Sequence, residues 1–236
     1  MSRKGNSTKK KTRTPYALAA LVVVVIVAVA GYYVYSSSSA STKSSTSTQL
    51  TGGCPAVTQT GGPNLIYACI KTNWGSMEIE LFPADAPKTV ANFVNLANSG
   101  FYNNLIWHRI APGFVIQTGD PTTRNGEGNR SLWGQGGSSQ TVPLEIDPAL
   151  HNTAGFIGMA RSSDPNSGSS QFYINLGPNT NLDGNYTVFG EVISGMPVAY
   201  AIAAVPTYGT SSTQYYEQPV NPANAVLISV TILSGA

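Results

Sequence analysis

HRIAPGFVIQTGD, residues 108–120, is the stretch that says most about the fold of this 236-residue chain. Residues 105–110 and 113–117 each have the apolar character of a short strand. Ala111-Pro112 separates them, and a proline cannot donate to the hydrogen-bond ladder of a sheet. The stretch therefore predicts two short strands joined by a tight turn.

Further strands are predicted on both sides of this stretch. In residues 76–82, Met77, Ile79 and Leu81 alternate with two glutamates, which is the pattern of a half-buried strand. A turn at 73–75 joins this strand to another at 64–72. Downstream, the apolar runs predict strands at residues 153–160, 171–176, 187–193 and 226–233.

Two helices interrupt the strands. The first opens at Asp85-Ala86-Pro87, with Asp85 or Ala86 as the cap and the proline in the first turn. The second covers residues 196–204 and ends before Pro206. Residues 118–140 are rich in Gly, Ser and Thr and predict a surface loop. Many short strands with two helices indicate a mostly β domain, either a closed barrel or a sandwich.

Charge is scarce and unevenly distributed. Charged residues make up 10% of the chain, and six of its 13 basic residues fall within the first 13 positions. From residue 44 onward the chain has six basic and 11 acidic residues, which gives a formal net charge of −5. This mildly acidic body argues against a nucleic-acid partner.

The basic N-terminus precedes an apolar segment. Residues 17–30 read ALAALVVVVIVAVA, and residues 16–35 are long enough to span roughly 30 Å of hydrocarbon as a helix. Because the cations lie only before this segment, we expect residues 1–15 to be a cytoplasmic tail and 16–35 a transmembrane signal-anchor. The alternative is a signal peptide cleaved near Ala30, which gives a secreted protein. A buried core helix is the third alternative, and the run of valines beside six cations disfavours it.

A stalk follows the apolar segment. Residues 36–51 contain eight Ser and four Thr, so 36–63 predict a flexible stalk and linker before a domain at 64–235. The only cysteines are Cys54 and Cys69, which in an oxidising compartment predict a disulfide; two independent thiols are the alternative. With two histidines and no cysteine cluster, no metal site is expected.

Three long motifs together identify a family. Residues 81–110 (LFPADAPKTVANFVNLANSGFYNNLIWHRI), 108–120 and 158–190 closely resemble the cyclophilins, the cyclosporin-binding class of peptidyl-prolyl cis-trans isomerases. The resemblance runs from Leu65 to Leu233, and the form MAR-S-DPNS-SQF is more similar to prokaryotic members. It implies a closed eight-stranded antiparallel β-barrel capped by two helices, no cofactor, and a monomer that acts on proline-containing polypeptides.

The chemistry of such an enzyme can be stated independently of the resemblance. An X–Pro bond isomerises over a barrier of about 18–20 kcal/mol because its amide is resonance-stabilised. A catalyst must therefore bind the twisted amide better than either planar isomer. A donor directed at the prolyl nitrogen and an apolar pocket for the proline ring satisfy this requirement.

The resemblance assigns these tasks to particular residues. It implies that Arg109 is the donor and that Gln117 orients it and binds the substrate. It implies a proline pocket of Phe114, Val115, Tyr173 and Leu182, with Tyr186 where cyclosporin-sensitive members have a histidine. Other implied substrate contacts are Gln171, near the substrate carbonyl, and the backbone of Ala160 and Arg161, which would pair with a bound peptide. The neighbouring His108 resembles a structural position.

A second departure from the family pattern affects the binding of cyclosporin. Asn181 stands where cyclosporin-sensitive members have a tryptophan, so weak cyclosporin binding is expected because a large apolar contact and an indole donor are both missing. The sequence thus predicts a membrane-anchored prolyl isomerase, with its catalytic domain outside the cytoplasm, that assists the folding of exported or cell-surface proteins. The alternative is a catalytically weak module that binds proline-containing peptides.

Overall fold

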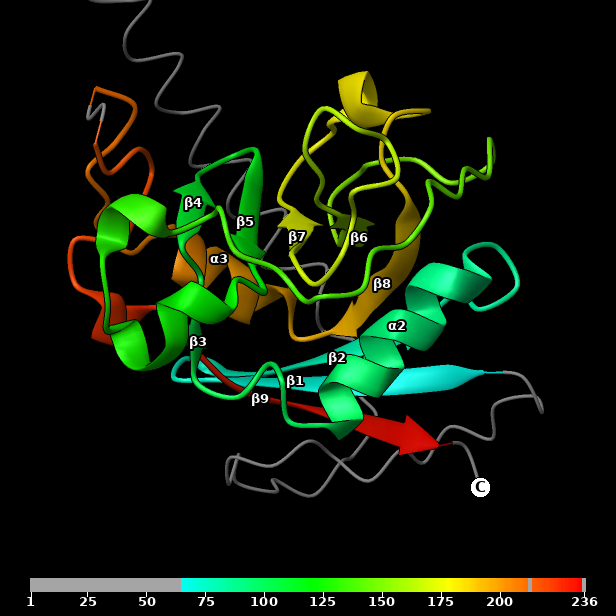
Figure 1. The fold of residues 1–236 in the computed structure, drawn as a ribbon, viewed down its shortest axis with the longest axis horizontal. Coiled ribbons are helices and arrows are strands. Elements are labelled where there is room, and N and C mark those ends of the chain that lie inside the picture. The colour runs from blue at the N-terminus through cyan, green and yellow to red at the C-terminus, as the bar shows by residue number, and fades with distance from the viewer. Residues whose placement is uncertain (1–64, 212–213, 235–236) are drawn as a thin grey trace, which may run out of the picture. The chain divides into compact units, whose positions relative to one another are not determined.

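The computed structural model describes residues 65–211 and 214–234. Its strands are β1 (Ile66–Thr72), β2 (Gly75–Leu81), β3 (Leu105–Ile106), β4 (Arg109–Ala111), β5 (Val115–Thr118), β6 (Phe156–Met159), β7 (Phe172–Asn175), β8 (Val188–Ser194) and β9 (Val226–Ser234). The α-helices are α2 (Pro87–Asn98) and α3 (Met196–Ala203). Figure 1 shows β1, β2 and β9 running across one side of the domain and β4 to β8 rising from it.

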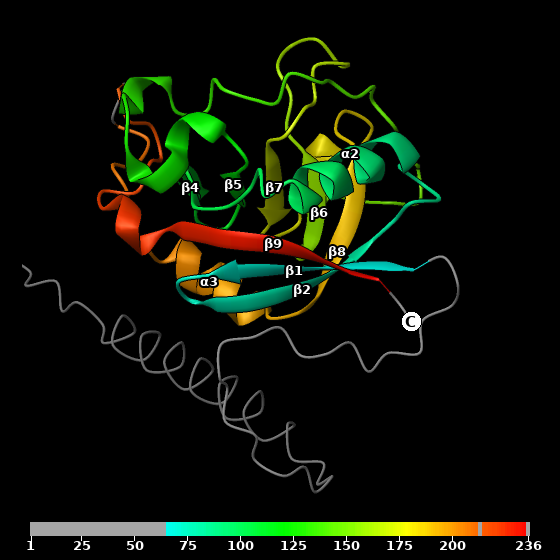
Figure 2. The same cartoon turned by 60° about the horizontal axis from the view of Figure 1, so that its bottom comes forward.

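All described strands belong to one antiparallel sheet in the order β3-β9-β1-β2-β8-β6-β7-β5-β4. The sheet curls, and α2 and α3 pack at opposite ends of it (Figure 2). The expected mostly β architecture is therefore confirmed, and the described residues hold the two expected α-helices.

The expectation of a closed eight-stranded barrel needs correction. In the described part of the chain the sheet has nine strands, and its two end strands, β3 and β4, do not pair with each other. The reason lies in residues 105–110, which were expected to form one strand. Leu105 and Ile106 pair with β9, whereas Arg109 pairs with Gln117 of β5. Trp107 and His108 connect β3 to β4. Because these are the two end strands of the sheet, the sheet curls far enough to bring its ends near each other, but it does not close.

The first helix is capped from a distance. Ala86 is its N-cap and supplies no side-chain hydrogen bond. Instead the carboxylate of Glu145 accepts hydrogen bonds from the N–H groups of Lys88, at 3.0 Å, and Thr89, at 2.9 Å. A carboxylate at this end of a helix also complements the helix dipole. Helix α2 is thereby tied to the long segment between β5 and β6.

Helix α2 covers the core with one aromatic side chain. The ring of Phe93, which is buried, lies 5.2 Å from that of Tyr102 and 5.4 Å from those of Phe172 and Phe189, measured between ring centres. Such offset and edge-on contacts are favourable beyond simple burial. The cluster joins α2 to β7 and β8, the strands next to the cavity described below.

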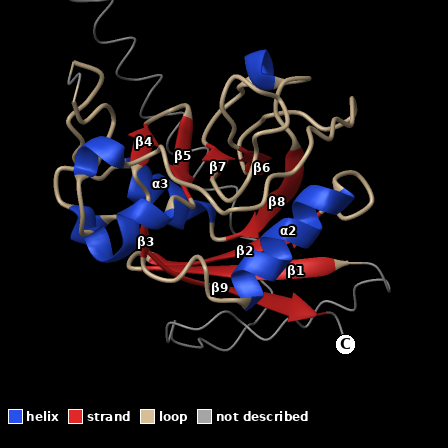
Figure 3. Cartoon of the chain, in the orientation of Figure 1, coloured by secondary structure: helices blue, strands red, loops and turns tan. Residues whose placement is uncertain are grey.

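The segment between β5 and β6 is more ordered than the expected surface loop at 118–140. It contains the 3-10 helices η1 (Pro121–Gly126) and η2 (Arg130–Leu132), seen in Figure 3 among long loops. Asp120, Thr123 and Trp133 are buried. Although its composition is polar, this segment therefore contributes to the interior.

Several expectations lie outside the described residues. These are the cytoplasmic tail at 1–15, the signal-anchor at 16–35 and the stalk and linker at 36–63, which includes Cys54. Cys69 is buried in β1, and its pairing with Cys54 stays a prediction. Within 65–211 and 214–234, no helix is both long enough and apolar enough to cross a membrane.

Candidate active site

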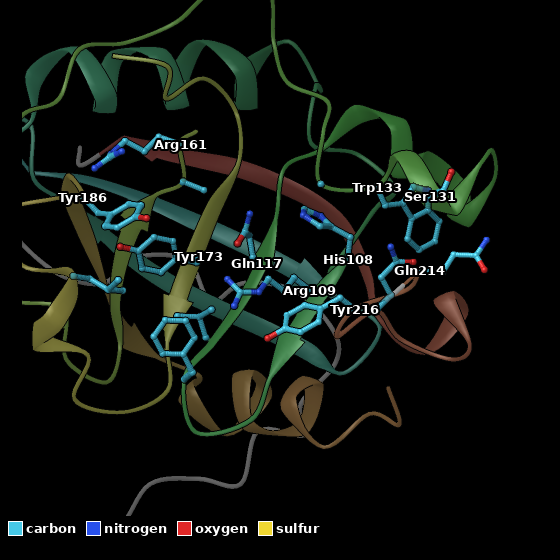
Figure 4. A pocket seen from close by; sticks show the side chains of 16 residues that line it. His108, Arg109, Gln117, Ser131, Trp133, Arg161, Tyr173, Tyr186, Gln214 and Tyr216 are labelled. Carbon is cyan, nitrogen blue, oxygen red and sulfur yellow. The ribbon is translucent and has the colours of Figure 1, made fainter. Parts of the chain in front are cut away.

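A cavity of about 420 Å³ opens beside β4, β5 and β7. Figure 4 shows Arg109 and Gln117 near its centre, Tyr173, Tyr186 and Arg161 to one side, and Trp133, Ser131 and Gln214 to the other. Apart from Gln171, every substrate or catalytic residue expected from the sequence lines it: Arg109, Phe114, Val115, Gln117, Ala160, Arg161, Tyr173, Leu182 and Tyr186. Gln171 lines an adjoining cavity of about 430 Å³ together with Gln117, Ala160 and Arg161.

The hairpin of β4 and β5 brings the central residues together. Arg109 and Gln117 face each other across the two strands, because they are direct partners in the register. The turn between them uses Gly113 at φ +77°, which glycine adopts without strain. Phe114 follows this turn, and its N–H donates to the carbonyl of Ala111 at 2.9 Å.

Arg109 is held on two sides. Its guanidinium carbon lies 5.5 Å from the centre of the Phe114 ring, a cation–π distance. Its Nε donates to Oε2 of Glu217 at 2.7 Å, and the Glu217 side chain is only 9% exposed against 34% for Arg109. The arginine therefore lies between an aromatic ring and a buried carboxylate, with its terminal nitrogens uninvolved in the ion pair.

The two glutamines bond to each other. Gln117 Nε2 donates to Gln171 Oε1 at 2.8 Å. Gln171 Nε2 in turn donates to the carbonyls of Gly134, at 3.0 Å, and Gly136, at 2.6 Å. Gln117, which was expected to orient the arginine, is thus held by Gln171, and the side chain that contacts the arginine Nε is Glu217.

A hydrogen-bond network fixes the Tyr173 ring. Its hydroxyl donates to Asn152 Oδ1 at 2.8 Å, and Asn152 donates from both N and Nδ2 to Asp183 Oδ1. His151 Nδ1 lies 2.9 Å from the other oxygen of Asp183. Burial alone would raise the pKa of Asp183, but the hydrogen bonds from Asn152 and His151 outweigh it and lower that pKa. Asp183 therefore anchors the network as a carboxylate.

Position 158 requires glycine because the Tyr173 ring packs directly against it. A Cβ at Gly158 would lie 2.2 Å from the ring and hydroxyl of Tyr173, which no real contact permits. Strand β6 can therefore pass against the aromatic face only as glycine. Tyr173 also lies 6.0 Å from Tyr186 between ring centres.

Arg161 closes one side of the cavity. Its guanidinium lies 4.7 Å from the Tyr186 ring centre, and its Nε donates to the carbonyl of Asn185 at 2.8 Å. The expected role of Ala160 and Arg161 was a backbone one. The N–H of Ala160 already donates to the carbonyl of Gln171, so a bound peptide would meet the Ala160 carbonyl.

His108 also lines the cavity, is almost fully buried and is neutral at physiological pH. Burial lowers its pKa to about 4, and although Asp120 opposes this effect, it does not overcome it. Asp120 is itself fully buried. It accepts hydrogen bonds from Thr122 N and Oγ1, both at 2.8 Å, and from the N–H groups of Gly134 and Gly136, at 2.5 and 3.2 Å. This carboxylate holds the 134–136 segment at the rim of the cavity.

Some lining residues had no sequence pattern to reveal them. The cavity also includes Ser131, Trp133, Gly134, Gln214, Tyr216 and Gln218. They come from the apparent surface loop at 118–140 and from the segment that follows α3. In the described residues, no group of three or more His, Cys, Asp or Glu could hold a metal ion. The site offers a fixed cation, amide donors and apolar surface.

Comparison with known proteins agrees with this arrangement. The family model for the cyclophilin type peptidyl-prolyl cis-trans isomerases matches residues 67–226. A peptidyl-prolyl cis-trans isomerase-like 1 of Aspergillus niger is 47% identical over 137 residues, which are 58% of this chain and 80% of the relative. Peptidyl-prolyl cis-trans isomerase ppi1 of Schizosaccharomyces pombe is 40% identical over 154 residues, 65% of this chain and 91% of that protein.

A solved structure is similar as well. The crystal structure of a Cryptosporidium parvum cyclophilin type isomerase in the presence of the dipeptide Ala-Pro superposes with a TM-score of 0.60 and 32% identity. It covers 70% of this chain and 98% of that one. The curated relatives named above are fungal, so they do not support the expected closer likeness to prokaryotic members.

Proposed function

The chain belongs to the cyclophilin-type peptidyl-prolyl cis-trans isomerases, and from this premise we propose that it isomerises X–Pro bonds of exported or cell-surface polypeptides and so assists their folding. The observation that carries this proposal is the position of Arg109. Its cationic group lies 5.5 Å from the Phe114 ring inside a cavity of about 420 Å³. A charge next to an apolar surface is what a twisted prolyl amide requires.

In the proposed mechanism, Arg109 stabilises the transition state. As the X–Pro bond twists, the nitrogen lone pair leaves conjugation with the carbonyl, and the nitrogen becomes a better hydrogen-bond acceptor. A terminal N–H of Arg109 donates to this nitrogen and so binds the twisted amide more tightly than either planar isomer. No bond is made or broken, and the guanidinium remains charged throughout.

The other lining residues bind the substrate on both sides of the rotating X–Pro bond. Phe114, Val115 and Leu182 provide apolar surface for the proline ring, and the hydrogen bond to Asn152 fixes the Tyr173 ring beside them. Gln117 Nε2 uses one N–H on Gln171 Oε1, and its second N–H can donate to the carbonyl of the residue before proline, while Gln171 holds the Gln117 amide in place. With the ring held, the preceding segment is the part that swings.

The proposed location rests on the N-terminal sequence. Six basic residues precede the apolar segment at 17–30, and the acidic body follows it. We therefore place residues 1–15 in the cytoplasm, residues 16–35 across the membrane and the catalytic domain outside. Cleavage near Ala30 is the alternative, and it would release the same domain as a secreted protein.

Protease treatment of intact cells tests the location. The domain should disappear from the membrane fraction while a cytoplasmic control protein survives. A domain that stays protected until the cells are lysed contradicts the proposed orientation. A mature chain that begins at Gly31 would identify the cleaved form. The full chain, assayed on a proline-containing peptide, tests the activity itself.

A further inference from the structure

The segment that follows α3 contributes a carboxylate to the catalytic arginine. Glu217 Oε2 accepts a hydrogen bond from Arg109 Nε at 2.7 Å, although the two residues are 108 positions apart in the sequence. We propose that Glu217 is a positioning residue, which fixes the rotamer of Arg109 so that the terminal nitrogens of the guanidinium face the prolyl nitrogen. This inference rests on the role proposed above for Arg109.

The main chain of Glu217 is fixed to the strand that carries Arg109. Its carbonyl accepts a hydrogen bond from the N–H of Ile110, the next residue of β4, at 2.8 Å. Its own N–H donates to the carbonyl of Gly209 at 3.1 Å. The carboxylate and the arginine therefore rise from adjacent backbone positions, and their distance does not depend on a freely moving loop.

The backbone conformation of Glu217 is a second and independent indication. Its φ is +53°, in the left-handed region. The other non-glycine residues with positive φ in the described part are Asn104 and Asn125, and asparagine tolerates this region well. Glutamate does not, and such conformations gather where function requires them. A glycine would relieve this strain but would supply no carboxylate.

The segment itself is held by Arg130. The guanidinium of Arg130 lies 4.8 Å from the ring centre of Trp133, 5.3 Å from that of Tyr208 and 5.4 Å from that of Tyr215. It also donates to the carbonyl of Pro219, and Gln218 Nε2 donates back to the carbonyl of Arg130 at 3.0 Å. The residues on both sides of Glu217 are thus anchored to the rim of the cavity.

Fixing the arginine has a clear catalytic consequence. Arginine has many rotamers, and a guanidinium that samples them is seldom directed at the reacting nitrogen. An Nε–carboxylate bond selects one rotamer before the substrate arrives. Because the bond uses Nε, the terminal nitrogens stay free to donate to the substrate, and burial of the carboxylate protects the pair from screening.

The test is a set of Glu217 variants in the full chain, assayed by kcat/KM on a proline-containing peptide. Glu217→Gln keeps the length and the accepting oxygen and should retain more than about half of the activity. Glu217→Asp keeps the charge and suits the left-handed backbone, but it is one methylene too short to reach Nε. Together with Glu217→Ala, it should lower kcat/KM by at least about fivefold. Glu127→Ala, which removes an exposed carboxylate, is the control and should be unchanged.

A double-mutant cycle separates positioning from a general effect on the fold. In the Arg109→Ala background, Glu217→Ala should cause no further loss, because the residue acts through the arginine. Thermal unfolding of each variant identifies those folded at the assay temperature. If Glu217→Ala does not fold, the comparison of Glu217→Asp with Glu217→Gln decides the question.

Three results would overturn the inference. These are full activity of Glu217→Asp, a loss in Glu217→Gln as large as in Glu217→Asp, and an equal loss from Glu217→Ala with and without Arg109. The proposed function fails in a different way, through an active Arg109→Ala. An inactive Arg109→Ala beside a fully active Glu217→Asp removes only the positioning role.

Discussion

The guanidinium carbon of Arg109 lies 5.5 Å from the centre of the Phe114 ring. This contact joins the two parts of the proposed site, because the ring that provides apolar surface for the proline also supports the cation that acts on its nitrogen. Replacing the ring should therefore affect substrate binding and the orientation of the arginine together.

Phe114→Ala should lower kcat/KM by at least about tenfold. Loss of roughly 100 Å² of apolar contact with the proline ring corresponds to about 2.5 kcal/mol, which is more than tenfold in the rate constant. Phe114→Tyr keeps the ring and should stay within about threefold of the unmodified protein. A folded Phe114→Ala protein of nearly normal activity would show that the substrate does not use this ring.

Asp120→Ala should destabilise the fold and loosen the rim of the cavity. The variant removes the buried acceptor of three partly buried N–H groups, those of Thr122, Gly134 and Gly136. Loss of an acceptor with several hydrogen-bond partners costs about 1–3 kcal/mol. Urea unfolding monitored by tryptophan fluorescence measures this, and a change below about 1 kcal/mol contradicts the role of Asp120.

His108 should make the protein less stable in mild acid. Its pKa is about 4 in the folded protein, against about 6.5 in an unfolded chain. Between these values the unfolded state binds more protons, so the free energy of unfolding falls as pH decreases from 6.5 to 4. The full effect is about 3 kcal/mol.

Carboxylates also titrate in this window, so the measurement needs a reference. His108→Gln lacks the titrating group, and its free energy of unfolding should depend less steeply on pH than that of the unmodified protein. Parallel curves for the two proteins across pH 4 to 6.5 would show that His108 does not titrate as described.

Cyclosporin should bind weakly. Asn181 is exposed in the 3-10 helix η3 (Thr180–Leu182), where the sensitive relatives are expected to present an indole. The missing apolar contact and hydrogen bond together correspond to roughly a hundredfold weaker binding. Asn181→Trp should restore inhibition and change kcat/KM only modestly. Inhibition of the unmodified protein at nanomolar cyclosporin would contradict this prediction.

The parts of the site that lie in one local motif could be predicted from the sequence. Arg109, Phe114 and Gln117 fall within nine residues of a hairpin, so the strand pattern already places them together. The division of residues 105–110 into β3 and β4 could not be predicted, since no turn residue separates the two halves and their long-range partners differ. A local pattern contains no information about which distant strand each half will meet.

Polar composition concealed other features. Trp133 is buried, yet it stands in a segment whose glycines and serines indicate a surface loop. Glu217 is a single acidic residue in a segment of polar and aromatic residues, and it meets Arg109 because the N–H of Ile110 in β4 donates to the Glu217 carbonyl. A contact between two side chains that are 108 residues apart produces no periodic pattern in the sequence.

The central claim is that Arg109 stabilises the twisted prolyl amide, and a protease-coupled isomerase assay of Arg109→Ala tests it most directly. The account predicts that the variant folds, and that its kcat/KM falls by at least about tenfold, equivalent to about 1.4 kcal/mol of transition-state stabilisation. Arg109→Lys should recover little, because an ammonium cannot bond Glu217 and present further donors in the same plane. Activity of a folded Arg109→Ala protein close to that of the unmodified chain would contradict the proposed mechanism.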